Sequence, residues 1–201
     1  MRVLLTGAAG QLGQALIASH PRQLGGEPLE LIACSRQGGG GHRALDLADP
    51  DACRNAVLEH RPHWVINAGA YTAVDRAETE PELATAVNAG APRALAEALV
   101  ARGGRLLQIS TDFVFDGSQG HPYTPTQARC PLGVYGASKA AGEQAVEELL
   151  GPAGRGTILR TSWVYGPVGH NFCLTMLRLH RQRAQAGEPL AVVADQVGCP
   201  T

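Results

Sequence analysis

The sequence predicts an α/β fold in which helices cover both faces of a doubly wound parallel sheet. Short apolar runs of strand length alternate along the chain with longer segments of helical periodicity. The strand-length runs lack a polar face, as expected for parallel strands that are buried on both sides. At 201 residues, the chain is long enough for one well-buried domain and part of another.

The alternation places the expected elements in order along the chain. Strands are predicted at residues 2–6, 29–34, 64–68, 105–110, 157–161 and 190–194. Helices are predicted at residues 11–19, 50–60, 80–102, 136–150 and 170–186. Glycines 38–41 are expected to form a flexible surface loop after the second strand.

Composition argues against several classes of function. Apolar residues make up 44% of the chain and charged residues 17%, and the formal net charge is −1. The arginines are dispersed, so no nucleic-acid partner is expected. No apolar run approaches the ~20 residues that span a membrane, and the start reads as a strand and turn rather than a signal peptide. The five dispersed cysteines form no metal or CxxC spacing, which indicates reduced thiols and a cytoplasmic location.

A glycine-rich turn follows the first predicted strand. Residues 6–13 read TGAAGQLG, so Gly7, Gly10 and Gly13 are spaced as G-x-x-G-x-x-G. We expect Gly7 to permit a tight turn, Gly10 to let a pyrophosphate approach the backbone, and Gly13 to let the helix pack closely. The N-terminus of the following helix adds N–H groups for phosphates. This pattern predicts a dinucleotide site in a Rossmann-type fold.

The end of the second strand indicates which dinucleotide binds. Sites for NAD usually carry an acid there, but this chain has Arg36. A guanidinium suits a 2′-phosphate, so NADPH is favoured and NADH is the alternative; Arg36 could instead be merely exposed on a loop. Asp46, followed by Leu47, could accept a hydrogen bond from an adenine amine, or could serve as a turn or N-cap residue.

The candidate catalytic residues lie after the fourth strand. That strand ends at Thr111 and Asp112, and ligands of open α/β sheets bind beyond the carboxyl ends of strands. Lys139, the only lysine, follows Tyr135 by four residues, so a helix places both side chains on one face. Hydride transfer to a carbonyl requires a proton donor, and we expect the lysine to lower the pKa of the Tyr135 phenol for that task. Thr111 is expected to orient the carbonyl, although a satisfied strand-end hydroxyl is the alternative.

Several sequence blocks resemble the extended short-chain dehydrogenases/reductases, and among them the dTDP-4-dehydrorhamnose reductase family. They are TGAAGQLG at 6–13, NAGAYTAVD at 67–75, STDFVFDG at 110–117, YGASK at 135–139, RTSWVYG at 160–166 and VADQVGCPT at 193–201. The resemblance implies NADPH-dependent reduction of the 4-keto group of dTDP-4-dehydro-L-rhamnose to dTDP-L-rhamnose, a nucleotide sugar for cell-surface polysaccharide.

The resemblance also implies roles for individual residues. Tyr135 would be the proton donor and Lys139 would also bind the nicotinamide ribose. Thr111 and Asp112 would touch the sugar and Trp163 would flank it, although a tryptophan in a small domain is more often part of the core. Together with the residues above, the implied cofactor-binding set is Gly7, Gly10, Gln11, Leu12, Gly13, Arg36, Asp46, Leu47, Ala70, Tyr71, Thr72, Tyr135 and Lys139.

The chain departs from the family pattern at two positions. Phe113 stands where tyrosine is common, which leaves the exact sugar open. Ala15 stands where some members use an acid to bind magnesium at a dimer contact, so no metal is expected, although Asp195 could match another ligand; a homodimer is left open.

The resemblance suggests how the chain is organised. We expect residues 1–168 to form the NADP-binding domain with the catalytic residues. Residues 169–201 would supply a last helix and strand leading into a substrate-binding lobe that is mostly absent, since relatives continue beyond this point. Two other functions stay open: an epimerase or dehydratase of the same superfamily, of which the dehydratase is disfavoured by the lack of an acid at 113, and a non-catalytic NADP-binding regulatory subunit.

Overall fold

The computed structural model describes residues 1–201, and the chain divides into two compact units, Met1–Arg160 and Thr161–Thr201. The boundary between the two units, after Arg160, lies close to the predicted domain boundary after residue 168. The assignment of residues 1–168 and 169–201 to two domains stays a prediction. None of the helices combines the length and apolarity that crossing a membrane requires.

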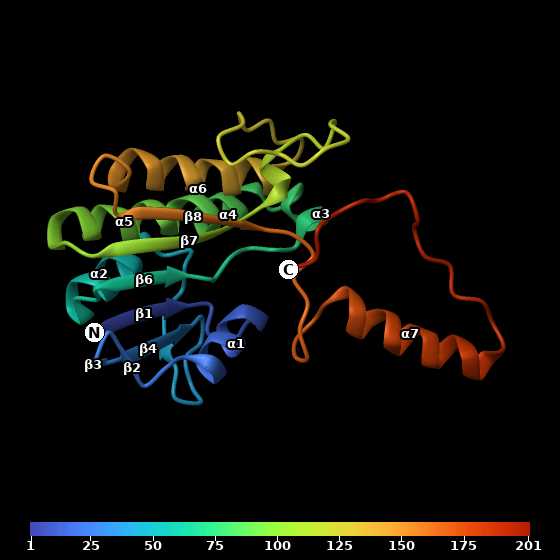
Figure 1. Ribbon diagram of the computed structural model, residues 1–201, viewed down its shortest axis with the longest axis horizontal. Coiled ribbons are helices and arrows are strands. Elements are labelled where there is room, and N and C mark those ends of the chain that lie inside the picture. The colour runs from blue at the N-terminus through green and yellow to red at the C-terminus, as the bar shows by residue number, and fades with distance from the viewer. The chain divides into compact units, whose positions relative to one another are not determined.

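A six-stranded sheet forms the first unit, in the order β5-β4-β1-β6-β7-β8 (Figure 1). The strands are β1 (Arg2–Thr6), β4 (Glu30–Ser35), β5 (Arg43–Ala44), β6 (Trp64–Asn67), β7 (Arg105–Thr111) and β8 (Gly156–Thr161). The β1–β4, β1–β6, β4–β5 and β6–β7 pairs are all parallel. The strand order changes direction between β1 and β6, so the crevice for a ligand lies beyond the carboxyl ends of these strands. The predicted fold class is confirmed.

The helices of the first unit are long where they cover the sheet and short elsewhere. They are α1 (Gln11–Ser19), α2 (Pro50–His60), α3 (Val74–Ala77), α4 (Pro81–Thr85), α5 (Ala91–Arg102) and α6 (Val134–Leu150). α2 packs on α5 and α5 packs on α6, and Figure 1 shows α5 and α6 lying along β7 and β8. A small hairpin, β2 (Gln23–Leu24) and β3 (Glu27–Pro28), stands apart from the main sheet.

The core fills the space between the central strands and the layer formed by α2, α5 and α6. Leu4, Val65 and Leu106 of β1, β6 and β7 are completely buried and belong to one apolar cluster with Leu95 and Leu99 of α5. Burial of a leucine side chain contributes about 2 kcal/mol, so this cluster fixes the strands whose ends form the site.

The helix predicted at 80–102 is interrupted. A π-helical turn, Ala86–Gly90, separates α4 from α5. Pro92 lacks the N–H group that would bond to the carbonyl of residue 88 in a regular α-helix, which explains why the pattern changes there. A Cβ on Gly142 of α6 would lie 2.1 Å from the Asn88 carbonyl oxygen, so α6 approaches this turn closely.

The strand predicted at 190–194 is wrong, because residues 188–201 contain neither helix nor strand. A strand requires a neighbour for its backbone N–H and C=O groups, and no strand pairs with this segment. Within the second unit, the Ser162 hydroxyl donates to the Cys199 carbonyl at 2.6 Å. The helix predicted at 170–186 is confirmed as α7 (Phe172–Ala186), which the Asn171 side chain caps by accepting from the Leu174 N–H at 3.0 Å.

Candidate active site

Glycines shape the loop that follows β1. Gly7 has a φ of +66°, and a Cβ there would lie 2.5 Å from the Gly69 nitrogen, so only glycine fits. A Cβ on Gly13 would lie 2.2 Å from the Gly7 oxygen, which shows how closely α1 packs on the turn. A Cβ on Gly10 would meet only the Gly7 oxygen, at 3.2 Å, so the backbone of Gly10 is otherwise open to a ligand.

The N-terminus of α1 faces this loop without a side-chain cap. Gly10 occupies the capping position, and no acidic residue lies in the first turn, which begins with Gln11 and Leu12. The positive end of the helix dipole and its first N–H groups therefore suit an anion such as a pyrophosphate.

The predicted residues Arg36 and Asp46 lie side by side. The Arg36 Nε atom is 3.9 Å from the Asp46 Oδ1 atom, with side chains 64% and 49% exposed. Asp46 also accepts a hydrogen bond from the Ala48 N–H at 3.0 Å, so it does serve as a turn residue. Leu47 is buried, and a Cβ on Gly69 would lie 2.5 Å from its Cδ1 atom. Arg36 thus has an exposed guanidinium that can meet a phosphate.

The segment after β6, which contains Ala70, Tyr71 and Thr72, is held by Asn88. The Tyr71 N–H donates to the Asn88 Oδ1 atom at 2.9 Å, and the Asn88 Nδ2 group donates to the Tyr71 carbonyl at 3.0 Å. The same Nδ2 group donates to the Ser138 hydroxyl of α6 at 3.0 Å. Asn88 therefore joins the predicted cofactor crevice to the helix that carries the candidate catalytic residues.

Sequence reasoning missed Asn88. It lies in the π-helical turn and is only 2% exposed. Such turns occur frequently at functional sites, and Pro92 inside the helical pattern was the available signal.

Thr111 and Tyr135 lie together, as the sequence predicts. The Thr111 hydroxyl lies near enough to the Tyr135 hydroxyl to influence its pKa. Thr111 also donates to the Asp112 carboxylate at 3.0 Å and accepts from the Phe113 N–H at 3.2 Å. The ring of Tyr135 is mostly buried and packs edge-on against Phe113, with centroids 5.5 Å apart.

The pKa of Tyr135 is raised, not lowered. Burial is the largest cause, and the Asp112 carboxylate adds to it, while the neighbouring Thr111 hydroxyl acts in the opposite direction. The expected lowering by Lys139 is not borne out, because Lys139 is not among the groups that shift this pKa and burial outweighs the one lowering contribution, which comes from Thr111.

Lys139 lies one turn after Tyr135 on α6 and is 4% exposed. Its Nζ atom donates to the Ile109 carbonyl at 2.7 Å, two residues before Thr111. Burial lowers the pKa of Lys139 to about 8, and the Glu143 carboxylate opposes that shift. The three predicted catalytic side chains are thus assembled at the carboxyl end of β7.

A row of buried polar side chains crosses the central strands beside the site. The Thr6 hydroxyl donates to the Asn67 Oδ1 atom at 2.5 Å, and the Asn67 Nδ2 group donates to the Gln108 Oε1 atom at 2.7 Å. The Gln108 Nε2 group donates to the Ile109 carbonyl at 2.8 Å, the same oxygen that Lys139 reaches. Because every member has a partner, the row fixes the strand ends relative to each other.

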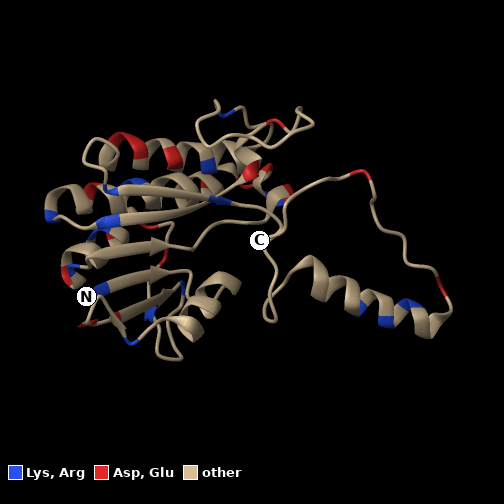
Figure 2. Ribbon diagram, viewed as in Figure 1, with Lys and Arg blue, Asp and Glu red and all other residues tan.

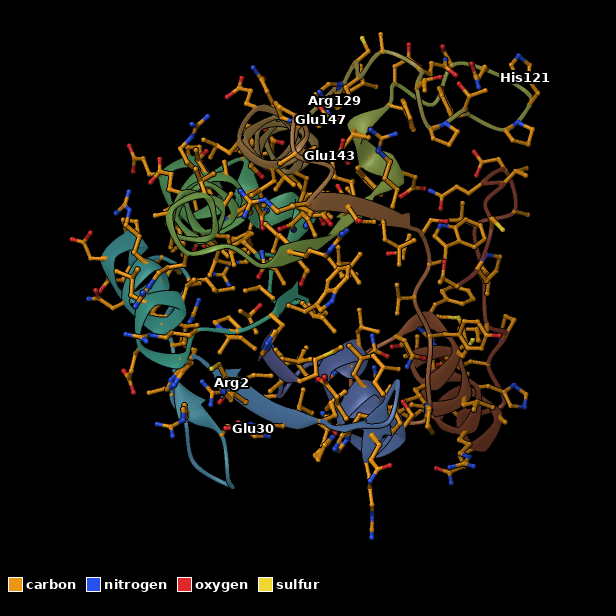
Figure 3. All side chains as sticks on the ribbon, turned by 60° about the vertical axis from the view of Figure 1, so that its left-hand side comes forward. Arg2, Glu30, His121, Arg129, Glu143 and Glu147 are labelled. Carbon is orange, nitrogen blue, oxygen red and sulfur yellow. The ribbon has the colours of Figure 1, made fainter.

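Glu143, one turn beyond Lys139, is a completely buried carboxylate. Arg160 donates to both of its oxygens, at 2.9 and 2.6 Å, and Arg129 donates to Oε2 at 3.0 Å. Arg129 also pairs with Glu147, and Figure 3 shows these labelled side chains converging on α6. Burial raises the pKa of Glu143, but hydrogen bonds from Arg160 and its neighbours dominate and hold it below its usual range.

This charged cluster also anchors the loop between β7 and α6. Arg160 donates to the Pro125 carbonyl at 3.0 Å, and its guanidinium lies 5.0 Å from the Phe115 ring centroid. Phe115 in turn stacks on Tyr123. The outer end of the loop, marked by His121 in Figure 3, lies away from the cluster.

Trp163 belongs to the second unit. Its φ is +48°, which is rare for a bulky residue, and a Cβ on Gly198 would lie 2.7 Å from its ring. The ring is 47% exposed, so it is not a core tryptophan. Its position beside a sugar stays a prediction, because Trp163 and the catalytic residues lie in different units.

Comparisons with known proteins identify the family. The family model described as the RmlD substrate binding domain matches residues 1–201. The dTDP-4-dehydrorhamnose reductase of Streptomyces griseus is 46% identical over 200 residues, which cover 100% of this chain and 60% of that protein. A probable dTDP-4,6-dihydroxy-2-methyloxan-3-one 4-ketoreductase of Streptomyces antibioticus is 44% identical over 202 residues, covering 100% of this chain and 63% of that protein.

A solved structure agrees with these relatives. The dTDP-4-dehydrorhamnose reductase of Bacillus anthracis in complex with NADP superimposes with a TM-score of 0.85 at 41% identity, covering 100% of this chain and 65% of that one. The chain thus spans about three fifths of the length of the curated relatives, 60% and 63% of the two named here. Throughout that length, it belongs to the RmlD substrate binding domain family.

Proposed function

We propose that this protein is an NADPH-dependent oxidoreductase that reduces the 4-keto group of dTDP-4-dehydro-L-rhamnose to dTDP-L-rhamnose. The observation that carries the proposal is the assembly of Thr111, Tyr135 and Lys139 at the end of β7, on the sheet edge that also bears the glycine loop. The names of the relatives support the substrate, and the NADP complex of the Bacillus anthracis protein supports the cofactor.

The residues at the sheet edge fit a dinucleotide phosphate. Gly10 presents open backbone, and the uncapped first turn of α1, with Gln11 and Leu12, offers N–H groups to a pyrophosphate. The exposed guanidinium of Arg36 would meet a 2′-phosphate, with Asp46 beside it. A reduced nicotinamide supplies the hydride when it is bound.

Tyr135 would act as the proton donor. As hydride reaches the carbonyl carbon, the carbonyl oxygen takes the phenolic proton and becomes the product hydroxyl. The raised pKa keeps Tyr135 protonated at neutral pH, so the donor is ready before the reaction. Thr111, which lies beside Tyr135, would orient the carbonyl, and the Lys139 ammonium would bind the ribose of the nicotinamide.

The other assignments complete this proposal. Asp112, exposed next to Thr111, and Trp163 would contact the sugar. The enzyme would work in the cytoplasm and supply dTDP-L-rhamnose for cell-surface polysaccharide.

The test is to mix the protein with NADPH and dTDP-4-dehydro-L-rhamnose and follow the absorbance of the reduced nicotinamide. We expect Tyr135→Phe to lose about 100-fold or more in turnover while keeping its affinity for NADPH. Tyr165→Phe is the matched control, since its ring is 56% exposed in the second unit. If the parent oxidises NADPH no faster than Tyr135→Phe, the proposal fails; NADPH binding without turnover would indicate a non-catalytic regulatory subunit.

A second substrate is favoured by one relative. The Streptomyces antibioticus protein is named for a different dTDP-sugar 4-keto reduction. Phe113, which lies against Tyr135, is 48% exposed and would meet the sugar without a hydroxyl group. Comparing kcat/KM for the two dTDP-4-keto sugars decides which substrate this site prefers.

A further inference from the structure

A pocket of about 490 Å³ lies at the end of the sheet where the strands begin, away from the candidate active site. Trp64 and Arg105 are the first residues of β6 and β7, and both line it. Its lining includes Arg61, Arg102 and Arg155 as well, but no aspartate or glutamate. Figure 2 shows basic residues at the starts of β7 and β8 and at the end of α5, on this side of the first unit.

The four arginines that line the pocket form no ion pairs with carboxylates, unlike most other arginines in the chain. Eight of the 16 arginines form ion pairs with carboxylates, namely Arg2, Arg36, Arg54, Arg76, Arg93, Arg129, Arg160 and Arg183. None of the pocket arginines has such a pair. Half of the arginines that lack a carboxylate therefore line one pocket, where their like charges repel each other.

Backbone carbonyls hold three of these guanidinium groups in place. Arg155 donates to the Leu99 carbonyl at 2.9 Å, Arg105 to the Gly154 carbonyl at 3.2 Å, and Arg102 to the Leu58 carbonyl at 3.4 Å.

A cation–π contact also holds Arg105, because its guanidinium lies 5.6 Å from the ring centroid of Trp64. These contacts orient the arginine side chains but do not neutralise their charge, and each guanidinium keeps further N–H donors.

We propose that this pocket binds a small phosphorylated molecule, with its phosphate oxygens on the guanidinium groups and its remainder against Trp64. Arginine forks match phosphate in geometry and charge, and an anion would relieve the repulsion between them. The volume lies within the range of about 300–1,000 Å³ that is usual for small-molecule sites. The net charge of −1 and the concave shape favour a small ligand over a nucleic acid. The proposal is independent of the reductase function.

Isothermal titration with inorganic pyrophosphate and with dTDP tests this site. The test variant is the double substitution Arg61→Asn with Arg105→Gln; asparagine suits position 61 because its φ is +45°. Arg22→Gln is the matched control, since Arg22 is exposed and does not line the pocket. Equal melting temperatures of the three proteins establish that the substitutions leave the fold intact; should the double variant melt earlier, Arg105→Gln alone replaces it.

We expect the parent and Arg22→Gln to bind at least one of the two probes, and the double variant to bind it about tenfold or more weakly. Loss of pyrophosphate binding and of dTDP binding together identifies the phosphate as the recognised group, whereas loss for dTDP alone identifies a nucleotide. Equal binding by parent and double variant would place the anion elsewhere and overturn the proposal. Binding of neither probe to the parent would overturn it as well.

Discussion

The ammonium of Lys139 donates a 2.7 Å hydrogen bond to the backbone carbonyl of Ile109, which joins α6 directly to β7 at the candidate active site. The Gln108 side chain donates to the same carbonyl at 2.8 Å. The only lysine of the chain is therefore held by the strand that ends at Thr111, and its ammonium, one helical turn from Tyr135, is almost completely removed from water.

Replacing Lys139 with arginine tests why a lysine occurs here. Lys139→Arg keeps the positive charge, but the larger planar guanidinium cannot take the place of the ammonium beside Ile109. We expect NADPH oxidation to fall about 100-fold. Arg93→Lys, which exchanges the same side chains at an exposed ion pair, is the control and should leave the rate unchanged. Turnover by Lys139→Arg at the parent rate would refute this explanation.

The lowered pKa of Lys139 predicts how stability depends on pH. Burial lowers the pKa of the folded state to about 8, below the unfolded value of 10.5. The cost of the buried ammonium is therefore fully present below about pH 8. It is relieved as pH rises toward 10.5, because the folded state loses its proton first.

Lys139→Met removes this titrating group. As the pH rises, the free energy of unfolding of the parent should therefore increase relative to that of the variant. We expect a relative gain of up to about 3 kcal/mol between about pH 7 and pH 10, measured by urea unfolding. Other groups titrate in both proteins and cancel in the difference. A difference that does not change with pH would show that Lys139 is not desolvated.

Asn88→Ala should destabilise the protein by about 1–3 kcal/mol, because the Tyr71 N–H and carbonyl would lose their partners in the interior. The control is Asn55→Ala, since Asn55 is exposed. Urea unfolding measures both variants. An equal decrease in the free energy of unfolding of both variants would mean that the hydrogen bonds of Asn88 do not stabilise the fold.

Glu143→Gln should destabilise the protein by about 3–5 kcal/mol, because Arg160 and Arg129 would face a neutral group in the interior. The pKa of Glu143 is lowered in the folded state, so its contribution is present above the unfolded pKa and disappears as pH falls through the folded pKa. The difference between parent and Glu143→Gln should therefore shrink in acid. Glu148→Gln, at an exposed pair on the same helix, is the control and should leave the stability almost unchanged, because solvent screens that pair.

Arg36→Gln should weaken NADPH binding about tenfold and leave NADH binding unchanged, since only NADPH carries the 2′-phosphate. Isothermal titration of both cofactors measures this. Arg22→Gln, an exposed arginine away from the sheet edge, serves as the control. Equal losses for NADPH and NADH would exclude a contact with the 2′-phosphate.

The sequence by itself determined the order of the longer strands and helices from β1 to α7, the turn at Gly7 and the placement of Tyr135 and Lys139 on one helix face. These features depend on residues within a turn or two of each other, so periodicity and spacing reveal them. The strand predicted at 190–194 shows the limit, because a strand forms only against a partner that the local pattern does not contain.

Only the tertiary structure decided the electrostatics of the site. The raised pKa of Tyr135 comes from burial, and the lowered pKa of Lys139 comes from its removal from water against β7. The link from Asn88 to Ser138 joins residues 50 positions apart, and the pocket of unpaired arginines gathers residues from Arg61 to Arg155. Desolvation and long-range hydrogen bonds depend on which distant segments pack together, and no local pattern carries that information.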